Sequence, residues 1–280
     1  MRGKSDTDAG MAITERLETG AAVRAACRDG SWTATTAGLA PGYVQANLVM
    51  LPAALADDFE AFCIANPQPC PLLERTAVGD AEPLRFAPGA DIRRDAPRYR
   101  VYVDGEARGG EPTDSLAHWR DDLVGFLLGC SFTFEAALHD AGIPLRHLEQ
   151  DVIVPMFRTS VDCTPVGPFA GPMVVSMRPI PADRVDEAHE ISARYPRVHG
   201  APVHAGDPAA LGIADIAAPD WGDPVEMRRD EVPVFWACGV TPQAVAQASR
   251  PPLMITHAPG HMFVTDWRDH ELAGDAPALA

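Results

Sequence analysis

The chain has 280 residues, of which 46% are hydrophobic, and a formal net charge of −16 at pH 7. This length can bury one large hydrophobic core or two modest ones. The negative charge argues against a nucleic-acid partner, because phosphates require a basic surface and the 23 Lys and Arg residues form no basic run. No apolar run approaches the roughly 20 residues of a membrane-spanning helix, and the first residues lack the apolar segment of a signal peptide. We therefore expect a cytoplasmic protein that binds neither membranes nor nucleic acid.

The numbers of cysteine and lysine residues indicate which kinds of site to expect. The six cysteines show neither a CxxC pair nor a regular spacing, which argues against disulfides and zinc ribbons and favours buried reduced thiols. Lys4 is the only lysine, so almost all positive charge belongs to arginine, the better bidentate ligand for carboxylates. A GC-rich genome explains the same bias without any binding site, and we rank that explanation first.

In the N-terminal half we expect a disordered tail over 1–11 and an α/β domain over 12–113. Gln45 and Asn47 lie two residues apart in a predicted strand and therefore share one of its faces. They either bind a ligand or hold a neighbouring loop, and the second role is commoner for buried amides. The elements expected in this half are a helix at 12–28, a strand at 43–52, a helix at 53–65 and a strand at 100–103 that enters a turn at Asp104.

A second α/β domain is expected over 114–268, followed by a tail at 269–280. It begins with an amphipathic helix over 116–129. The next helix is capped by Ser131 or Thr133 and ends at Gly142. Glu135 then lies in its first turn, near the positive end of the helix dipole, either as a capping partner or as an acid in a small polar pocket.

The middle of this domain carries arginines and histidines. Two predicted strands contain one arginine each, Arg158 and Arg178, and charged residues inside strands need partners or solvent. A loop rich in Gly and Pro then carries His199, His204 and Asp207. The expected elements are strands at 152–163 and 171–180 and a helix at 183–194.

Residues 231–261 are typical of a strand, a helix and a second strand. Two strands joined by one helix over so few residues are expected to lie parallel, with a right-handed crossover. The loops at 238–243 and 256–261 then share a crevice at the carboxyl edge of the sheet, where free helix amides favour an anion. The expected elements are a strand at Val232 to Cys238 that Gly239 ends, a helix that Thr241 caps and Pro242 begins, and a strand at Leu253 to Thr256. The sequence thus predicts an α/β fold with mixed sheets, a parallel βαβ unit and two domains or subdomains.

Four histidines in Gly/Pro loops are candidates for proton transfer, namely His199, His204, His257 and His261. Proline and glycine between them prevent the helical turn of an HExxH zinc site, so we expect no metal and no cofactor. A histidine acid or base needs no metal and works near its own pKa. A serine hydrolase built on Ser131 is disfavoured, because GxSxG is missing and a helix, not a strand, is expected before the serine.

Several segments in order along the chain resemble the D-glutamate cyclase family, many members of which carry hydro-lyase names. The likeness runs from Thr36 to Asp266. Met50 and Phe157 depart from the family pattern, in which an aliphatic residue and a tyrosine are expected. The segments are GYVQANLVMLP, FCIANPQPCPLLE, DIRRDAPRYRVY, GCSFTFE, VPMFRT, GPMVVSMRPI, HGAPVHAGDP, VPVFWACGVTPQ and THAPGHMFVTD.

The resemblance implies that D-glutamate is cyclised to 5-oxo-D-proline with loss of water. This reaction requires deprotonation of the ammonium, neutralisation of the γ-carboxylate and stabilisation of a tetrahedral oxyanion. The candidate acids and bases are Glu135, His204, Asp207, His257 and His261. The candidate substrate-binding residues are Gln45, Asn47, Ser131, Arg158, Arg178, Gly239 and Thr241.

Two other functions are kept beside this one. The first is a hydro-lyase acting on another small hydroxy or amino acid, and the second is a non-enzymatic carboxylate-binding protein. In each case the expected partner is a small acidic amino acid or carboxylate, and a homo-oligomer is also considered.

Overall fold

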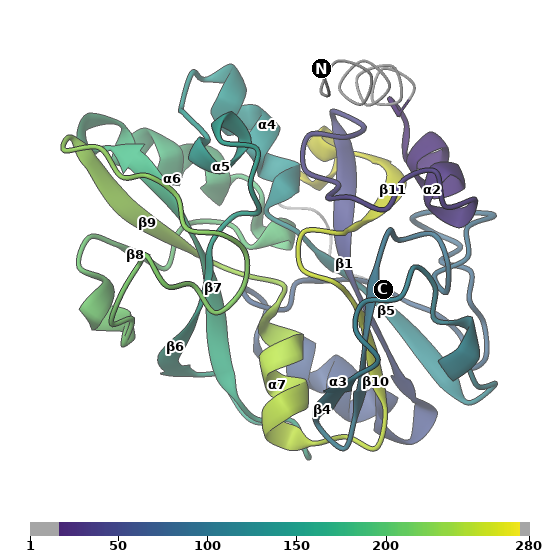
Figure 1. Cartoon of the computed structure of the whole chain (residues 1–280). Coiled ribbons are helices and arrows are strands. Elements are labelled where there is room, and N and C mark those ends of the chain that lie inside the picture. The colour runs from purple at the N-terminus through teal and green to yellow at the C-terminus, as the bar shows by residue number, and fades with distance from the viewer. Residues whose placement is uncertain (1–16, 275–280) are drawn as a thin grey trace, which may run out of the picture.

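The computed structural model describes residues 17–274, which form two antiparallel sheets with helices around and between them (Figure 1). The α-helices are α2 (Gly20–Arg28), α3 (Ala53–Ala65), α4 (Phe132–Asp140), α5 (Arg146–Glu149), α6 (Val185–Ala193) and α7 (Thr241–Ser249). The strands are β1 (Tyr43–Pro52), β2 (Leu72–Arg75), β3 (Tyr99–Val103), β4 (Glu106–Arg108), β5 (Leu123–Gly129), β6 (Met156–Asp162), β7 (Pro172–Pro181), β8 (His204–Ala205), β9 (Glu231–Ala237), β10 (Met254–His257) and β11 (Phe263–Arg268). Short 3₁₀ turns are η1 (Leu116–His118), η2 (Ala182–Arg184), η3 (Pro196–Val198), η4 (Pro208–Leu211) and η5 (Asp269–Leu272).

The first sheet has seven strands, with β1 at its centre. Its order is β2-β5-β1-β10-β3-β4, and β11 also pairs with β1. β5 occupies one edge of β1, while β10 and β11 share the other, so that Val49 faces Thr256 and Gln45 faces Val264. This centre of the sheet therefore needs both the early and the late part of the chain.

The second sheet has four strands in the order β6-β7-β9-β8 and is formed wholly by the stretch of chain between β5 and β10. Val234 and Trp236 of β9 pack in one hydrophobic cluster with Val44, Leu48 and other β1 residues of the first sheet. The two sheets thus share a core, and α4 contributes Phe134 to the same cluster.

The parallel βαβ unit predicted over 231–261 is wrong, although its three elements are present. All strand pairs in both sheets are antiparallel, and β9 belongs to the four-stranded sheet while β10 belongs to the seven-stranded one. The reason lies in α7, which is apolar on two sides. Val245 and Ala246 pack with Phe126 of β5, whereas Ala244 packs with Val174 of β7. The helix therefore carries the chain from one sheet to the other (Figure 1).

The amphipathic helix predicted over 116–129 is also wrong. Leu123–Gly129 form β5, which lies between β1 and β2 and is buried at every position. A strand buried on both faces does not alternate in polarity, so its apolar run is easily mistaken for one side of a helix. The residues before β5 form η1 and a loop.

Most other elements follow the predictions. Strand 43–52 and helix 53–65 have the predicted bounds, and β3 enters β4 through the turn at Asp104 and Gly105. Of the helix predicted over 12–28, the described part begins at Gly20, and the tail predicted over 1–11 lies outside the described residues. Residues 269–272, predicted as tail, form η5 and bury Leu272 in the core.

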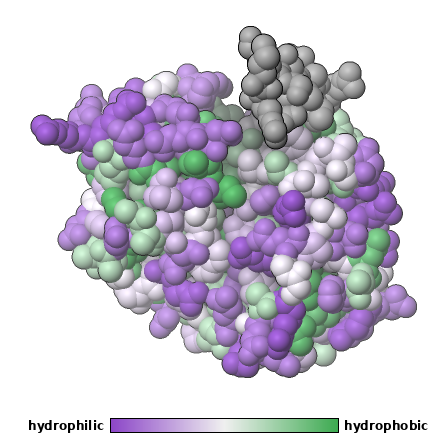
Figure 2. All heavy atoms as spheres, in the orientation of Figure 1, coloured by the Kyte–Doolittle hydropathy of each residue, from purple (hydrophilic) through white to green (hydrophobic). Residues whose placement is uncertain are grey.

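The division into domains stays a prediction. The boundary expected before residue 114 falls between β4 and β5, which belong to the same sheet. Over residues 17–274, no helix is long and apolar enough to cross a membrane. The face shown in Figure 2 is mostly hydrophilic, with hydrophobic residues in small separate areas.

Candidate active site

A buried ion-pair cluster joins α4 to the second sheet. Glu135 accepts hydrogen bonds from Nε of Arg178, at 2.9 Å, and from its Nη2. Arg178 also donates to the hydroxyls of Ser131 and Ser176, at 2.9 and 3.1 Å. Nε2 of His147 lies 3.2 Å from the same carboxylate oxygen, without hydrogen-bond alignment. All five side chains are buried, so each charge depends on its neighbours for stabilisation.

The charges in this cluster fix the state of Glu135. Burial alone raises its pKa, but His147 and Arg178 together lower the pKa of Glu135 to about 2. The carboxylate is therefore ionised at neutral pH and cannot serve as a proton donor there. Arg178 directs its donors to Glu135, Ser131 and Ser176, and it also faces the rings of Phe134 and Trp236.

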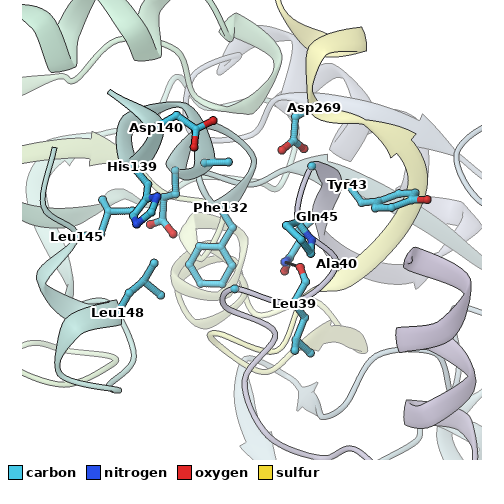
Figure 3. A pocket seen from close by; sticks show the side chains of 15 residues that line it. Leu39, Ala40, Tyr43, Gln45, Phe132, His139, Asp140, Leu145, Leu148 and Asp269 are labelled. Atoms are coloured by element: carbon cyan, nitrogen blue, oxygen red, sulfur yellow. Dashed lines mark hydrogen bonds between the residues drawn. The ribbon is translucent and has the colours of Figure 1, made fainter. Parts of the chain in front are cut away.

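Glu135 also borders a cavity of about 330 Å³ between α4 and α5 on one side and the loop before β1 on the other (Figure 3). Gln45 and Asp269 lie on the side of that loop, and Figure 3 shows them across the cavity from Phe132 and His139. The lining residues with polar side chains are Tyr43, Gln45, Glu135, His139, Asp140 and Asp269. No arginine belongs to this lining among the described residues, so the cavity wall is acidic.

Two residues of the cavity wall each carry a buried acceptor atom without a hydrogen-bond partner among the described residues, namely Oε1 of Gln45 and Oδ1 of Asp269. The amide nitrogen of Gln45 donates to the carbonyls of Thr36 and Leu39, at 2.9 and 3.2 Å. Gln45 thus holds the neighbouring loop, which is the commoner of its two predicted roles, and leaves its oxygen for another donor. Burial raises the pKa of Asp269 to about 7, against the lowering effect of Arg268.

His257 and His261 are both buried near the end of β10. Nδ1 of His257 lies 3.1 Å from the backbone nitrogen and 3.4 Å from the backbone carbonyl oxygen of Leu48, contacts that fit either neutral tautomer, and its Nε2 is buried without a partner among the described residues. Burial lowers the pKa of His257 to about 4. Nδ1 of His261 donates to the carbonyl of Pro259 at 2.8 Å, and burial lowers its pKa as well. Both rings are therefore neutral at pH 7 and suited to donate or accept a hydrogen bond.

The loops 238–243 and 256–261 do lie side by side, although no parallel strands bring them together. The Gln243 amide donates to the carbonyl of His257 at 3.0 Å. A Cβ on Gly239 would overlap the side-chain amide of Asn47, which donates to the carbonyl of Gly129 at 2.6 Å. Glycine is thus required where the second sheet's loop meets β1.

Thr241 does not cap α7 as predicted. The helix begins at Thr241 itself, and Val240 holds the N-cap position without a side-chain hydrogen bond. The Thr241 hydroxyl instead donates to the carbonyl of Cys238 at 2.7 Å and accepts from the N–H of Val174 at 3.0 Å. Its contacts fasten α7 to β7.

Ser131 is likewise not a cap. Its backbone is helical, α4 starts at Phe132, and its hydroxyl accepts from Arg178. Because β5 precedes it, the prediction that a helix leads into Ser131 is wrong, and that argument against a serine nucleophile falls. The other argument stands, since GxSxG is missing and the hydroxyl's partner is a guanidinium that cannot take its proton.

His204, Asp207 and Arg158 lie away from the cluster. His204 pairs with Phe235 of β9 and stacks on its ring, whereas Arg178 is opposite Val234, so the pleat places the two side chains on opposite faces of the sheet. The Asp207 side chain accepts from the N–H of Ala209 and caps η4. Arg158 is exposed and donates to Gln247. Nothing in this geometry brings them to the cavity.

Comparisons with known proteins decide the family. The sequence profile of the D-glutamate cyclase family matches residues 124–266. A "Putative hydro-lyase" of Stutzerimonas stutzeri is 59% identical over 90% of this chain and 95% of its own length. Proteins of the same name from Geobacillus kaustophilus and Rubrobacter xylanophilus are 58% and 60% identical, over 88% and 90% of this chain and 93% and 96% of their own lengths.

The chain belongs to the D-glutamate cyclase family. Among solved structures, a nitrogen repressor-like protein from Methanococcus jannaschii matches with a TM-score of 0.39 and 11% identity over 92% of this chain and 99% of its own. A likeness of that size supports no inference about fold or function.

In this cyclase-family chain, sequence reasoning missed His147 and Asp269. His147 lies in α5, which has only four residues and so no hydrophobic period to reveal it. Asp269 was placed in a tail, although the apolar run of β11 ends just before it. His199 is a further buried histidine, whose Nδ1 donates to the carbonyl of Gln68 at 2.6 Å and whose pKa is lowered to about 4 by burial.

The remaining candidates for chemistry in this protein are its thiols and possible metal ligands. All six cysteines are buried and free, and burial raises the pKa of Cys238 to about 11. Within the described part of the chain, no group of three or more His, Cys, Asp or Glu residues is arranged to hold a metal ion. Whether the reaction needs a metal stays a prediction to be tested with chelator.

Proposed function

We propose that this protein is a lyase that cyclises D-glutamate to 5-oxo-D-proline and water, in the cavity between α4 and the loop before β1. The observation that carries this proposal is the family match over residues 124–266. These residues include Glu135, which borders the cavity, and its partners His147 and Arg178. The wider class, hydro-lyase, agrees with the names of the relatives.

The cavity suits one end of the substrate in particular. Its walls carry the carboxylates of Glu135, Asp140 and Asp269 and the unpartnered amide oxygen of Gln45. Such a set of acceptors favours an ammonium group, which is a strong donor without acceptor capacity. The amine that must attack the γ-carboxyl group is therefore the part of D-glutamate that these walls favour.

The substrate carboxylates need donors, and in this proposal the loop before β1 supplies them. Gly38 and Gly42 adopt left-handed conformations, with φ of 75° and 77°, on the cavity wall. Their backbone N–H groups have no acceptor among the described residues. Each of these two N–H groups is therefore available to donate one hydrogen bond to a substrate carboxylate. Arg178 is not proposed to bind a substrate carboxylate, because its guanidinium already donates hydrogen bonds to Glu135, Ser131 and Ser176.

The direct test is to incubate the purified protein with D-glutamate and with L-glutamate and to measure 5-oxoproline by chromatography. We expect turnover of the D isomer, and we expect EDTA to leave it unchanged. Asp121→Asn is the matched control, because Asp121 is an exposed carboxylate outside the cavity lining. Loss of activity with EDTA and recovery with one divalent ion would contradict the metal-free reaction.

The same assay separates the alternatives. Dehydration of a hydroxy acid without turnover of D-glutamate would favour a hydro-lyase with another substrate. Binding of D-glutamate in calorimetry without any product would favour a carboxylate-binding protein. The oligomeric state of the chain stays a prediction that does not enter this test.

A further inference from the structure

The cavity wall opposite α4 carries a carboxyl group that the sequence did not single out. Asp269 is the first residue of η5, directly after β11. Its backbone N–H donates to the carbonyl of Gly42 at 3.0 Å, which fixes η5 against the loop that lines the cavity. Figure 3 shows the Asp269 carboxyl group and the Gln45 amide on the same side of the cavity.

Two features of this wall indicate the chemistry of its ligand. Oε1 of Gln45 belongs to a side chain that is only 4% exposed, and Oδ1 of Asp269 is also buried, yet neither has a hydrogen-bond partner among the described residues. Buried polar atoms are almost always satisfied, and an unsatisfied one needs an explanation. Both atoms are acceptors, so a single group that satisfied both of them would have to donate at least two hydrogen bonds. A primary ammonium group has three donors.

The charges around Asp269 do not neutralise it. Arg268 is its neighbour in the chain, but its guanidinium lies over the ring of Tyr43, 3.7 Å from the centroid, and no ion pair joins it to Asp269 among the described residues. The charged and titratable groups on the elements around it are Arg268, His270 and Glu271 on its own segment, Asp266 on β11, Tyr43 on β1, Arg197 on η3, and Glu135, His139 and Asp140 across the cavity.

We infer that Asp269 and Gln45 form the subsite for the substrate's α-ammonium group, and that Asp269 is the base that removes its proton. This inference rests on the proposed function. Gln45 positions the nitrogen through Oε1, and the Asp269 carboxylate accepts one proton from it. The resulting amine has the free electron pair that ring closure requires.

The proton balance of the reaction is complete without any other reactant. The neutral amine attacks the γ-carboxyl carbon and forms the new C–N bond. The nitrogen then gives up a second proton, so two protons leave it in all. Both end on the departing γ-carboxyl oxygen, which leaves as water when its C–O bond breaks. Asp269 returns its proton in this step and is ionised again for the next turnover.

Asp269→Asn is the first test, because it keeps the shape of the side chain and removes the base. We expect turnover of D-glutamate to fall by about 10²-fold or more. In the wild-type protein, kcat/KM is expected to rise with pH through about 7, since burial raises the pKa of Asp269 to that value, and this limb is expected to disappear in the variant. A structural role alone would not remove the limb.

A second variant guards against a folding defect. In Asp269→Ala, added formate can occupy the place of the missing carboxylate and accept the proton, and we expect it to restore turnover about tenfold or more. Asp121→Asn, which lies outside the cavity, is expected to keep the wild-type rate and pH profile. Near-wild-type turnover and an unchanged pH limb in Asp269→Asn would overturn the inference.

Calorimetry separates this inference from the proposed function. The wild-type protein is titrated with D-glutamate and with glutarate, which has the same two carboxylates but no amine. We expect D-glutamate to bind at least tenfold more tightly, and we expect Asp269→Asn to lose this preference. Absence of turnover in the wild type removes the cyclase proposal, whereas equal binding of both acids removes the ammonium subsite whatever the turnover.

Discussion

The two walls of the cavity hold carboxyl groups in opposite electrostatic settings. On the α4 wall, burial raises the pKa of Glu135, but Arg178 and His147 outweigh it and hold the pKa at about 2. On the η5 wall, burial raises the pKa of Asp269 to about 7, because Arg268 offsets it only in part. Burial acts in the same direction on both groups, so the difference comes from His147 and Arg178, which lower the pKa of Glu135 more than Arg268 lowers that of Asp269.

This contrast assigns different tasks to the two walls. A carboxylate that stays ionised can hold partners in place but cannot exchange protons near neutral pH. A carboxyl group that titrates near 7 can do so with little energetic cost in either direction. Pairs of groups whose surroundings drive their pKa values apart are typical of acid and base assignments in enzymes.

The largest effect is expected from Arg178→Met, which leaves Glu135 buried without the guanidinium that donates to it. Breaking a buried ion pair by removing one partner typically costs about 3–5 kcal/mol. We expect a loss of this size in the free energy of unfolding, measured with urea at pH 7. Adding Glu135→Gln to this variant should recover at least half of the loss. A loss below about 1 kcal/mol in Arg178→Met would show that the α4 wall is not held by this pair.

A smaller effect is expected when the wild-type protein is acidified. The folded-state pKa of Glu135, about 2, lies below its ordinary value of 4.5, so its stabilisation is present above pH 4.5 and is lost as the pH falls toward 2. The full shift corresponds to about 3 kcal/mol. Urea unfolding at several pH values should show this slope in the wild type and a flatter one in Glu135→Gln. The same dependence of stability on pH in the wild type and in Glu135→Gln would contradict a lowered pKa of Glu135.

For Asp269, the stability of the protein should change with pH in the opposite direction to that expected for Glu135. The folded-state pKa of Asp269 lies above its ordinary value of 3.8, so the wild type loses stability as the pH rises from about 4 to 7 and then levels off. Partial exposure reduces the expected change to roughly 2 kcal/mol. Asp269→Asn should lack this loss and be more stable than the wild type at pH 8. A variant that is equally stable at pH 5 and less stable at pH 8 would refute the contrast between the walls.

The smallest effect is expected from His204→Ala, on the face of the second sheet that turns away from the cluster. Its ring is half-buried and stacks on Phe235, and its Nε2 donates to the carbonyl of Asp207 at 2.8 Å. We expect a stability change of about 0.5 kcal/mol and an unchanged rate of 5-oxoproline formation. A large fall in that rate would restore His204 to the site.

The positions of helices and strands along the chain could be predicted from the sequence, but which strands pair with each other could not. The bounds of β1 and α3 follow from the apolar pattern and from proline, and they are correct. The sheet to which β9 belongs cannot be read from its apolar pattern. The sequences of β9 and β10 are compatible with an α7 that returns the chain to the same sheet and with one that crosses to the other sheet. The strand β5 was taken for a helix for a different reason, because a strand buried on both faces does not alternate in polarity.

The site was predictable to a similar degree. Glu135 stood out through its polar surroundings at the start of a helix, and two roles were predicted for it, capping partner or pocket acid. It borders the cavity, and its side-chain partners are Arg178 and His147, which come from other segments of the chain. The pKa of Asp269 depends on burial by the tertiary fold, which no local pattern encodes. His257 and Gly239 were correctly expected on neighbouring loops, though for a wrong topological reason.

The pairing of β1 has a consequence for the synthesis of the chain. β1 emerges from the ribosome early, yet two of its three partner strands, β10 and β11, come from residues 254–268. Until then one edge of this apolar strand has no native partner, while the whole second sheet is being made. Contacts between such distant residues slow folding and leave strand edges open to aggregation. The nascent chain must therefore protect the edge of β1 for most of its translation.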